Sequence, residues 1–133
     1  EDKKLLCDYA KMLEIEQSIY VTGRLPAESV SDYLNLADVF IMGSFFEGWS
    51  TSLVEAICVG LPACVTNFSS ASELVEEGVN GFVVKSRNAE EFSDKMIKSL
   101  DIEEHVLLRK VDSFRHLDIS NLRKDILDRW ELI

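Results

Sequence analysis

The chain has 133 residues, 47% of them hydrophobic, which is the composition of one globular domain rather than of a disordered segment. Its 24 acidic and 14 basic residues give a formal net charge of −10. Nucleic acids and anionic membranes attract basic surfaces, so neither is expected as a partner of this segment. No apolar run approaches the roughly 18 residues that a membrane-spanning helix needs.

Strand and helix patterns alternate along the first hundred residues. The elements expected in chain order are a helix over 3–14, a strand over 19–22, a helix over 31–37, a strand over 38–42, a helix over 52–59, a strand over 63–66, a helical turn over 73–77, a strand over 81–84 and a helix over 89–100. Beyond Leu100 only helical patterns follow, over 105–114 and 121–132. This order predicts an α/β fold with a four-stranded parallel sheet flanked by helices and a helical C-terminal tail.

The most informative stretch runs from Phe45 to Ala56, where two carboxylates, Glu47 and Glu55, lie eight positions apart across a strand–loop–helix junction. Ligands of open α/β sheets bind outside the carboxyl ends of the strands. The free N–H groups that open a helix form an anion site. A carboxylate, an anion site and a second carboxylate suit a ligand with hydroxyls at both ends and phosphate between them, which is the layout of a nucleotide-sugar.

This stretch resembles the Glu-x7-Glu signature of the retaining glycosyltransferases of family 4, in the nucleotide-binding half of the GT-B fold. The likeness runs from about residue 18 to residue 100 and keeps the family's order of motifs. These are Gly23-Arg24-Leu25, Asp38-Val39-Phe40, Glu47-Gly48-Trp49, Glu55-Ala56, Gly60-Leu61-Pro62, Ser72-Glu73-Leu74-Val75 and the run from Gly78 to Val84. The resemblance implies a Rossmann-like parallel sheet that forms part of a GT-B C-terminal domain.

The resemblance also implies an activity. The parent protein would be a hexosyltransferase-type enzyme that moves a sugar from a nucleoside-diphosphate-sugar to an acceptor hydroxyl. It would need no metal or other cofactor, and bacterial glycan or capsular polysaccharide synthesis would be a typical setting. Three cysteines without a C-x-x-C spacing favour reduced thiols and a cytoplasmic location. The family also allows a peripheral position of the parent protein at the inner membrane face.

Site roles follow from the resemblance residue by residue. Glu47 would hydrogen-bond the donor sugar as the catalytic residue, and Glu55 would accept hydrogen bonds from the ribose. The backbone near Arg24 and Leu25 would flank the nucleobase. The residues that would complete the donor-binding loop beside the diphosphate are Gly48, Trp49, Ser50 and Thr51.

Simpler structural roles remain open for several of these residues. Glu47 could be a solvated loop acid, and Arg24 a solvated loop base. Glu55 lies three positions after Ser52, the spacing of a capping box, so it could instead reach back to the start of its helix. Trp49 could pack against the sheet.

Parts of the family pattern have no counterpart here. Two earlier strands, with an Arg and a Lys that bind the donor diphosphate, are unmatched, and so is the acceptor-binding domain. We therefore expect residues 1–100 to be an N-terminally truncated donor domain, residues 101–133 its helical extension, and the missing N-terminal acceptor-binding domain its partner. The run Ser69-Ser70-Ala71-Ser72-Glu73 also fills the place of a commonly Gly-rich turn before Glu. A nucleotide-sugar epimerase with a GT-B-like fold, or a non-catalytic interaction module, remains an alternative.

Overall fold

The computed structural model describes residues 2–86, 88–103, 105–107 and 111, which fall into two compact units divided between Val30 and Ser31. The elements in chain order are α1 (Asp2–Met12), the 3-10 turn η1 (Glu16–Ser18), α2 (Ala27–Leu36), β1 (Phe40–Met42), α3 (Thr51–Cys58), β2 (Ala63–Thr66), α4 (Ala71–Leu74), β3 (Gly81–Val84) and α5 (Ala89–Ser99). Within these described residues, every helix is too short or too polar to span a lipid bilayer.

The first unit contains α1, η1 and the start of α2. The helix predicted over 3–14 is confirmed as α1, which is followed by Glu14 with a left-handed φ of 59°. The strand predicted over 19–22 is wrong, since these residues form an extended loop without strand pairing. A β-strand is defined by hydrogen bonds to a neighbouring strand. The described residues of this unit include no other strand that could supply them.

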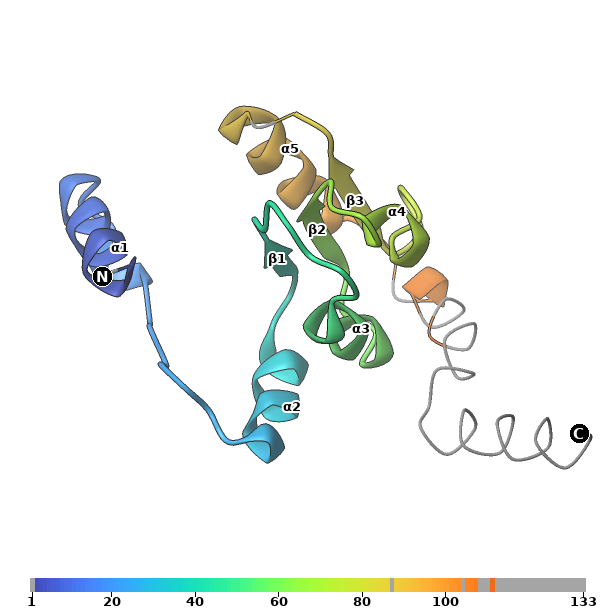
Figure 1. Cartoon of the computed structure of the whole chain (residues 1–133), viewed down its shortest axis with the longest axis horizontal. Helices are drawn as coiled ribbons and strands as arrows, with labels where there is room; N and C mark the ends of the chain where they lie inside the picture. The colour runs from blue at the N-terminus through green and yellow to red at the C-terminus, as the bar shows by residue number, and fades with distance from the viewer. Residues whose placement is uncertain (1, 87, 104, 108–110, 112–133) are drawn as a thin grey trace, which may run out of the picture. The chain divides into compact units, whose positions relative to one another are not determined.

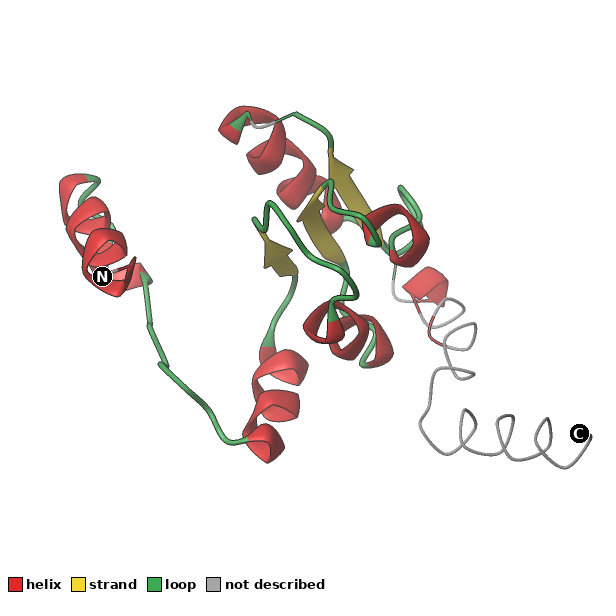
Figure 2. Cartoon of the chain, in the orientation of Figure 1, coloured by secondary structure: helices red, strands yellow, loops and turns green. Residues whose placement is uncertain are grey.

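The second unit is built on a parallel sheet of three strands, in the order β1-β2-β3 (Figures 1 and 2). Ile41 pairs with Cys64, and Cys64 pairs with Phe82, which sets the register across the sheet. The α/β class and the parallel, helix-flanked sheet are confirmed, with three strands instead of four. All three carboxyl ends therefore lie along one edge of the sheet.

The two faces of the sheet are covered by different helices. One face packs against α3 and α4 and forms the main core, whose buried members are Leu53, Ile57, Ala63, Val65, Phe68, Ala71, Leu74, Val75 and Val83. The opposite face carries Cys64 and Phe82, which contact α5 through the Phe92 carbonyl and through Lys95. Figure 1 shows α5 on one side of the strands and α3 with α4 toward the other. Strand alternation thus assigns each residue to one of two layers.

Close approach of β2 and β3 depends on one glycine. Gly81 opens β3 with a φ of +153°, and a Cβ there would lie 1.9 Å from the carbonyl oxygen of Ala63. Only a residue without a side chain fits at this point. The start of β3 is therefore fixed by sterics as well as by its apolar sequence.

Several boundaries differ from the sequence expectations. Helix α2 begins four residues earlier than predicted, at Ala27, directly after Pro26. Helix α4 covers Ala71–Leu74 rather than 73–77. The strands over 63–66 and 81–84 are confirmed to the residue. In the tail, residues 105–107 are helical, while the rest of the predicted tail helices lies outside the described residues.

Candidate functional site at the carboxyl ends of the strands

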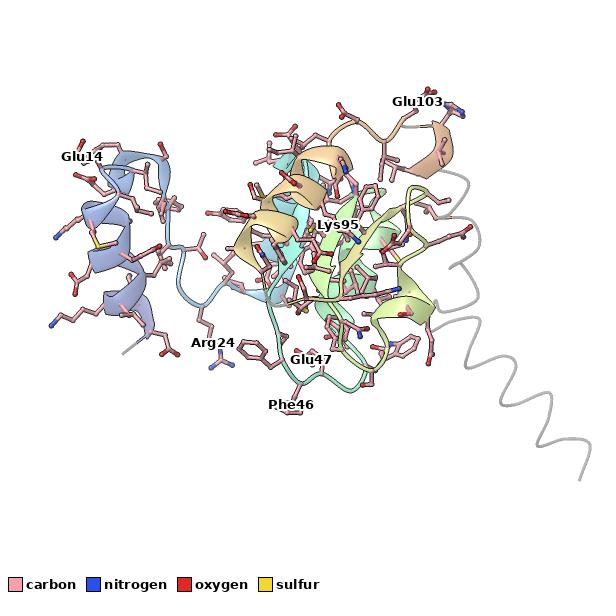
Figure 3. All side chains as sticks on the ribbon, turned by 90° about the horizontal axis from the view of Figure 1, so that it is seen from above. Glu14, Arg24, Phe46, Glu47, Lys95 and Glu103 are labelled. Atoms are coloured by element: carbon pink, nitrogen blue, oxygen red, sulfur yellow. The ribbon has the colours of Figure 1, made fainter. Side chains whose placement is uncertain are left out.

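The loop over 43–49 connects the carboxyl end of β1 to α3 and carries the first of the two predicted acids. Glu47 is half-buried in this loop, whereas the neighbouring Phe46 is 92% exposed. Figure 3 shows both residues on the loop that follows β1. The position is the one expected for a ligand-binding residue in a parallel sheet, beyond the end of a strand rather than within it.

Glu47 lines a cavity of about 690 Å³. The other lining residues are Phe45, Phe46, Gly48, Asn67, Phe68 and Ser69. The loop after β1 supplies one wall and the loop after β2 supplies the other, because the two strands are neighbours in the sheet. The volume lies in the range of small-molecule sites. A carboxylate, an amide and a hydroxyl beside aromatic rings suit a ligand with hydroxyls and a C–H face.

Two hydroxyls from the second wall hold the first wall in place. Thr66 donates a hydrogen bond to the carbonyl of Ser44 and lies 3.4 Å from the carbonyl of Met42. Ser69 donates to the carbonyl of Glu47, and its hydroxyl lies 3.5 Å from the carbonyl of Gly48. The β1–α3 loop is therefore anchored near both of its ends by the chain that follows β2.

The start of α3 is capped by Ser50 rather than by Ser52. The Ser50 hydroxyl accepts a hydrogen bond from the Leu53 amide at 3.3 Å, and it lies 3.4 Å from the Ser52 hydroxyl. Ser50 is 2% exposed, so its side chain serves the fold. The amides of Thr51 and Ser52 belong to the first helical turn, where backbone N–H groups have no intrahelical acceptor. These two amides are the groups that the predicted anion site would use, and anion binding there stays a prediction.

Glu55 lies on the solvent-facing stripe of α3. The exposed residues Thr51, Glu55 and Cys58 follow one another at helical spacing, opposite the buried Leu53 and Ile57. Because Ser50 is the cap, the capping-box position belongs to Leu53, and the capping role considered for Glu55 is wrong. Within the described residues its carboxylate makes no side-chain hydrogen bond or ion pair. It therefore remains available to a ligand, although it does not line the 690 Å³ cavity.

For the remaining predicted residues the structure gives a location but does not test the predicted role. Trp49 is 50% exposed at the end of the loop, which leaves its packing against the sheet as an open alternative. Arg24 and Leu25 belong to the first compact unit, and their place beside a nucleobase stays a prediction. Glu47 and Gly48 therefore line the same cavity. Thr51 and Glu55 belong to α3, and Ser50 caps that helix.

Sequence reasoning missed the cavity wall contributed by Asn67, Phe68 and Ser69. A signal was present, because these residues directly follow β2, and Ser69 departs from the Gly-rich turn of the resembled family. A smaller adjoining cavity of about 200 Å³ shares Phe45 and Asn67 with the first and is also lined by Lys85. Lys85 was likewise not predicted.

Other reactive groups in the described part give no competing centre. Burial raises the pKa of the Cys64 thiol to about 11, so this cysteine is a neutral thiol near pH 7. Cys58 is exposed on the outer stripe of α3. Among the residues described by the structure, no three His, Cys, Asp or Glu side chains gather in a way that could hold a metal ion.

Comparisons with known proteins place the chain in a family. The profile of the family described as "Glycosyl transferases group 1" matches residues 1–110. An uncharacterized glycosyltransferase of Haemophilus influenzae is 30% identical over 135 residues, covering 98% of this chain and 36% of the relative. A putative colanic acid biosynthesis glycosyltransferase, WcaL of Salmonella typhimurium, is 27% identical over 122 residues, covering 87% of this chain and 30% of the relative.

An enzyme with a different kind of name also occurs among the relatives. A sucrose synthase of Thermosynechococcus vestitus is 28% identical over 111 residues, covering 75% of this chain and 14% of the relative. The chain therefore spans between 14% and 36% of the length of these three curated relatives. No solved structure matches it.

Proposed function

The chain belongs to the group 1 glycosyltransferases, and on that premise we propose that residues 1–100 form part of the donor-binding domain of a retaining enzyme. The enzyme transfers a hexosyl group from a nucleoside-diphosphate-sugar to an acceptor hydroxyl. The observation that carries this proposal is that the half-buried Glu47 lines a 690 Å³ cavity and lies in the loop that leads into the N-terminus of α3.

The proposed chemistry assigns one part of the donor to each feature. The Glu47 carboxylate accepts hydrogen bonds from hydroxyls of the sugar, whose anomeric carbon gains positive charge as its bond to the diphosphate breaks. Negative charge grows on the leaving diphosphate, and the first-turn amides of α3 stabilise it. Glu55 accepts hydrogen bonds from the ribose. Neutral donors at a helix terminus take the place of a metal in this scheme.

The relatives support a biological setting for the proposal. One of them is named for colanic acid biosynthesis, and on that ground we place the parent protein in bacterial glycan synthesis. Because the chain covers 36% or less of the relatives described above, the acceptor site is proposed to lie in a separate domain of the parent protein. A cytoplasmic location fits this role, since nucleotide-sugars are the proposed donors.

Nuclear magnetic resonance titration of the chain tests the proposal. UDP, GDP, UDP-glucose and GDP-mannose are added in turn, and the amides of residues 47–52 are expected to shift. Glu55→Gln should weaken binding of every ligand that contains ribose, whereas Glu47→Gln should weaken only the two nucleotide-sugars. Asp94→Asn, which removes an exposed carboxylate from α5, is the matched control.

Two results would contradict the proposal. Shifts confined to residues outside the β1–α3 loop and the start of α3 would place any nucleotide elsewhere. No binding of any of the four ligands at millimolar concentration would instead favour the non-catalytic interaction module.

A further inference from the structure

We infer that Ser69 is a positioning residue for Glu47. Its hydroxyl reaches from the loop after β2 and donates a hydrogen bond to the backbone carbonyl of Glu47, 22 positions earlier in the chain. Glu47 itself lines the 690 Å³ cavity, and Ser69 lines its other wall. This inference rests on the proposed function, and it specifies how the sugar-binding group is held.

The need for such a tether follows from the composition of the loop. Gly43 and Gly48 lie near its two ends, and a Cβ built on either would meet no atom within 4 Å. Phe46 projects into solvent with 92% of its surface exposed. Packing therefore restrains this part of the loop weakly, and glycine allows its backbone a wide range of conformations. Hydrogen bonds from outside the loop therefore add a restraint where its glycines and Phe46 supply little.

Thr66 and Ser69 divide this task between them. Thr66 bonds the beginning of the loop, at the Ser44 carbonyl. Ser69 bonds the Glu47–Gly48 segment, where the functional side chain branches from the backbone. Fixing the peptide that follows the Glu47 Cα limits the directions that its carboxylate can take. A carboxylate with fewer available directions loses less entropy when it binds a sugar hydroxyl.

The hydrogen bond to the β1–α3 loop belongs to Ser69, one of the two adjacent serines that follow β2. Ser70, the next residue, is 5% exposed, and within the described residues its hydroxyl has no hydrogen-bond partner. The two adjacent serines therefore differ, and only Ser69 bridges to the β1–α3 loop.

The test compares the chain with Ser69→Ala, Ser69→Thr and Ser72→Ala. Ser72 is an exposed serine in α4 and serves as the matched control. Dissociation constants are measured by NMR for UDP-glucose and GDP-mannose, and for UDP and GDP as their sugar-free counterparts. Backbone order parameters are measured for residues 46–49 in the same samples.

Ser69→Ala should weaken binding of the preferred nucleotide-sugar about 2- to 12-fold, the effect of one hydrogen bond, and leave the free nucleoside diphosphate unchanged. Order parameters of residues 47 and 48 should fall toward about 0.6. Ser69→Thr keeps the hydroxyl, so the dissociation constants and the order parameters should stay near those of the unchanged chain. Ser72→Ala should change neither. Equal weakening of both ligand classes, or unchanged order parameters, would overturn the inference.

The same experiment separates this inference from the proposed function. If the chain binds no nucleotide-sugar, the proposed function fails, and the order parameters alone decide whether Ser69 restrains the loop. If nucleotide-sugars bind and Ser69→Ala has no selective effect, the proposed function stands and the positioning role is refuted.

Discussion

Lys95 connects α5 to β3, the edge strand of the three-stranded sheet, and its replacement by methionine gives the sharpest test of the packing. Its Nζ lies 2.8 Å from the Val83 carbonyl and 3.0 Å from a carboxylate oxygen of Glu77. It also lies 5.9 Å from the centroid of the Phe82 ring. Figure 3 shows Lys95 between α5 and the strands. Methionine retains the apolar stem of the side chain and removes only the ammonium.

The expected loss is about 2 kcal/mol. A hydrogen bond from a charged group contributes roughly 1.5–3 kcal/mol when its partner is left unpaired, as the Val83 carbonyl would be. The ion pair with Glu77 adds less than about 1 kcal/mol, because the Glu77 side chain is 49% exposed and screened by solvent. Removing the partly buried ammonium also removes the free-energy cost of its desolvation, which offsets part of this loss. A change of 2 kcal/mol corresponds to a fall in Tm of about 8 °C.

The loss should depend on pH in a direction set by Glu77. A hydrogen bond from Lys95, together with its positive charge, lowers the pKa of this carboxyl below its ordinary value. The unfolded chain therefore binds the proton first as pH falls, so the pair stabilises the fold above about pH 4.3 and less below the lowered pKa. Lys95→Met should thus be less destabilising at pH 3 than at pH 7.

Urea unfolding at both pH values measures this effect. Lys98→Met is the control, because Lys98 is exposed on the same helix and no ion pair of its side chain occurs among the described residues. We expect the control to change the free energy of unfolding by less than about 0.5 kcal/mol. Equal free energies for Lys95→Met and the unchanged chain at pH 7 would refute the reasoning, as would a loss that grows on acidification.

The other predictions concern the sheet, a buried hydroxyl and the two acids. Gly81→Ala should cost more than about 4 kcal/mol, because its Cβ would overlap the Ala63 carbonyl, and circular dichroism should show loss of the folded state. Ser70→Ala removes a buried hydroxyl that has no partner among the described residues, so it should leave Tm unchanged or raise it, whereas a clear fall in Tm would reveal a partner elsewhere in the chain. In the complete parent enzyme, Glu55→Ala should mainly raise KM and Glu47→Ala should mainly lower kcat, which steady-state kinetics would distinguish.

The strands could be predicted where local sequence and tertiary context agree. The runs over 63–66 and 81–84 are short, apolar and bounded by glycine or proline, and each becomes a strand of the same length. The run over 19–22 has similar chemistry and is an extended loop. Strand propensity describes a residue's fit to a pleated surface, and it cannot supply the neighbour that a strand requires. The two outcomes therefore differ because of pairing rather than composition.

The places of the candidate site residues in the fold could also be predicted only in part. The strand–loop–helix pattern identified the loop that carries Glu47 and the helix that carries Glu55. It could not choose a cap among Ser50, Thr51 and Ser52, because all three side chains can cap a helix. Nor could it identify the wall formed by the residues after β2, since that contact depends on the parallel register between β1 and β2. The order of elements along the chain could be read from the sequence, whereas contacts between loops that follow different strands could not.

The charge of the chain bears directly on how tightly this site can hold its proposed ligand. A nucleoside diphosphate is an anion, and the net charge of −10 opposes its approach. One exposed helix terminus contributes roughly 0.3–1 kcal/mol toward an anion, too little for tight binding. Lys85 lines the smaller adjoining cavity rather than the 690 Å³ one.

The chain alone should therefore bind UDP and GDP weakly, in the range of about 1 mM, and transfer no sugar. Weak binding should tighten when salt is added, because screening reduces the repulsion between the acidic chain and the anion. Calorimetric titration at two ionic strengths measures this dependence. Micromolar affinity, or affinity that weakens as salt rises, would mean that cationic groups of this chain dominate the site after all.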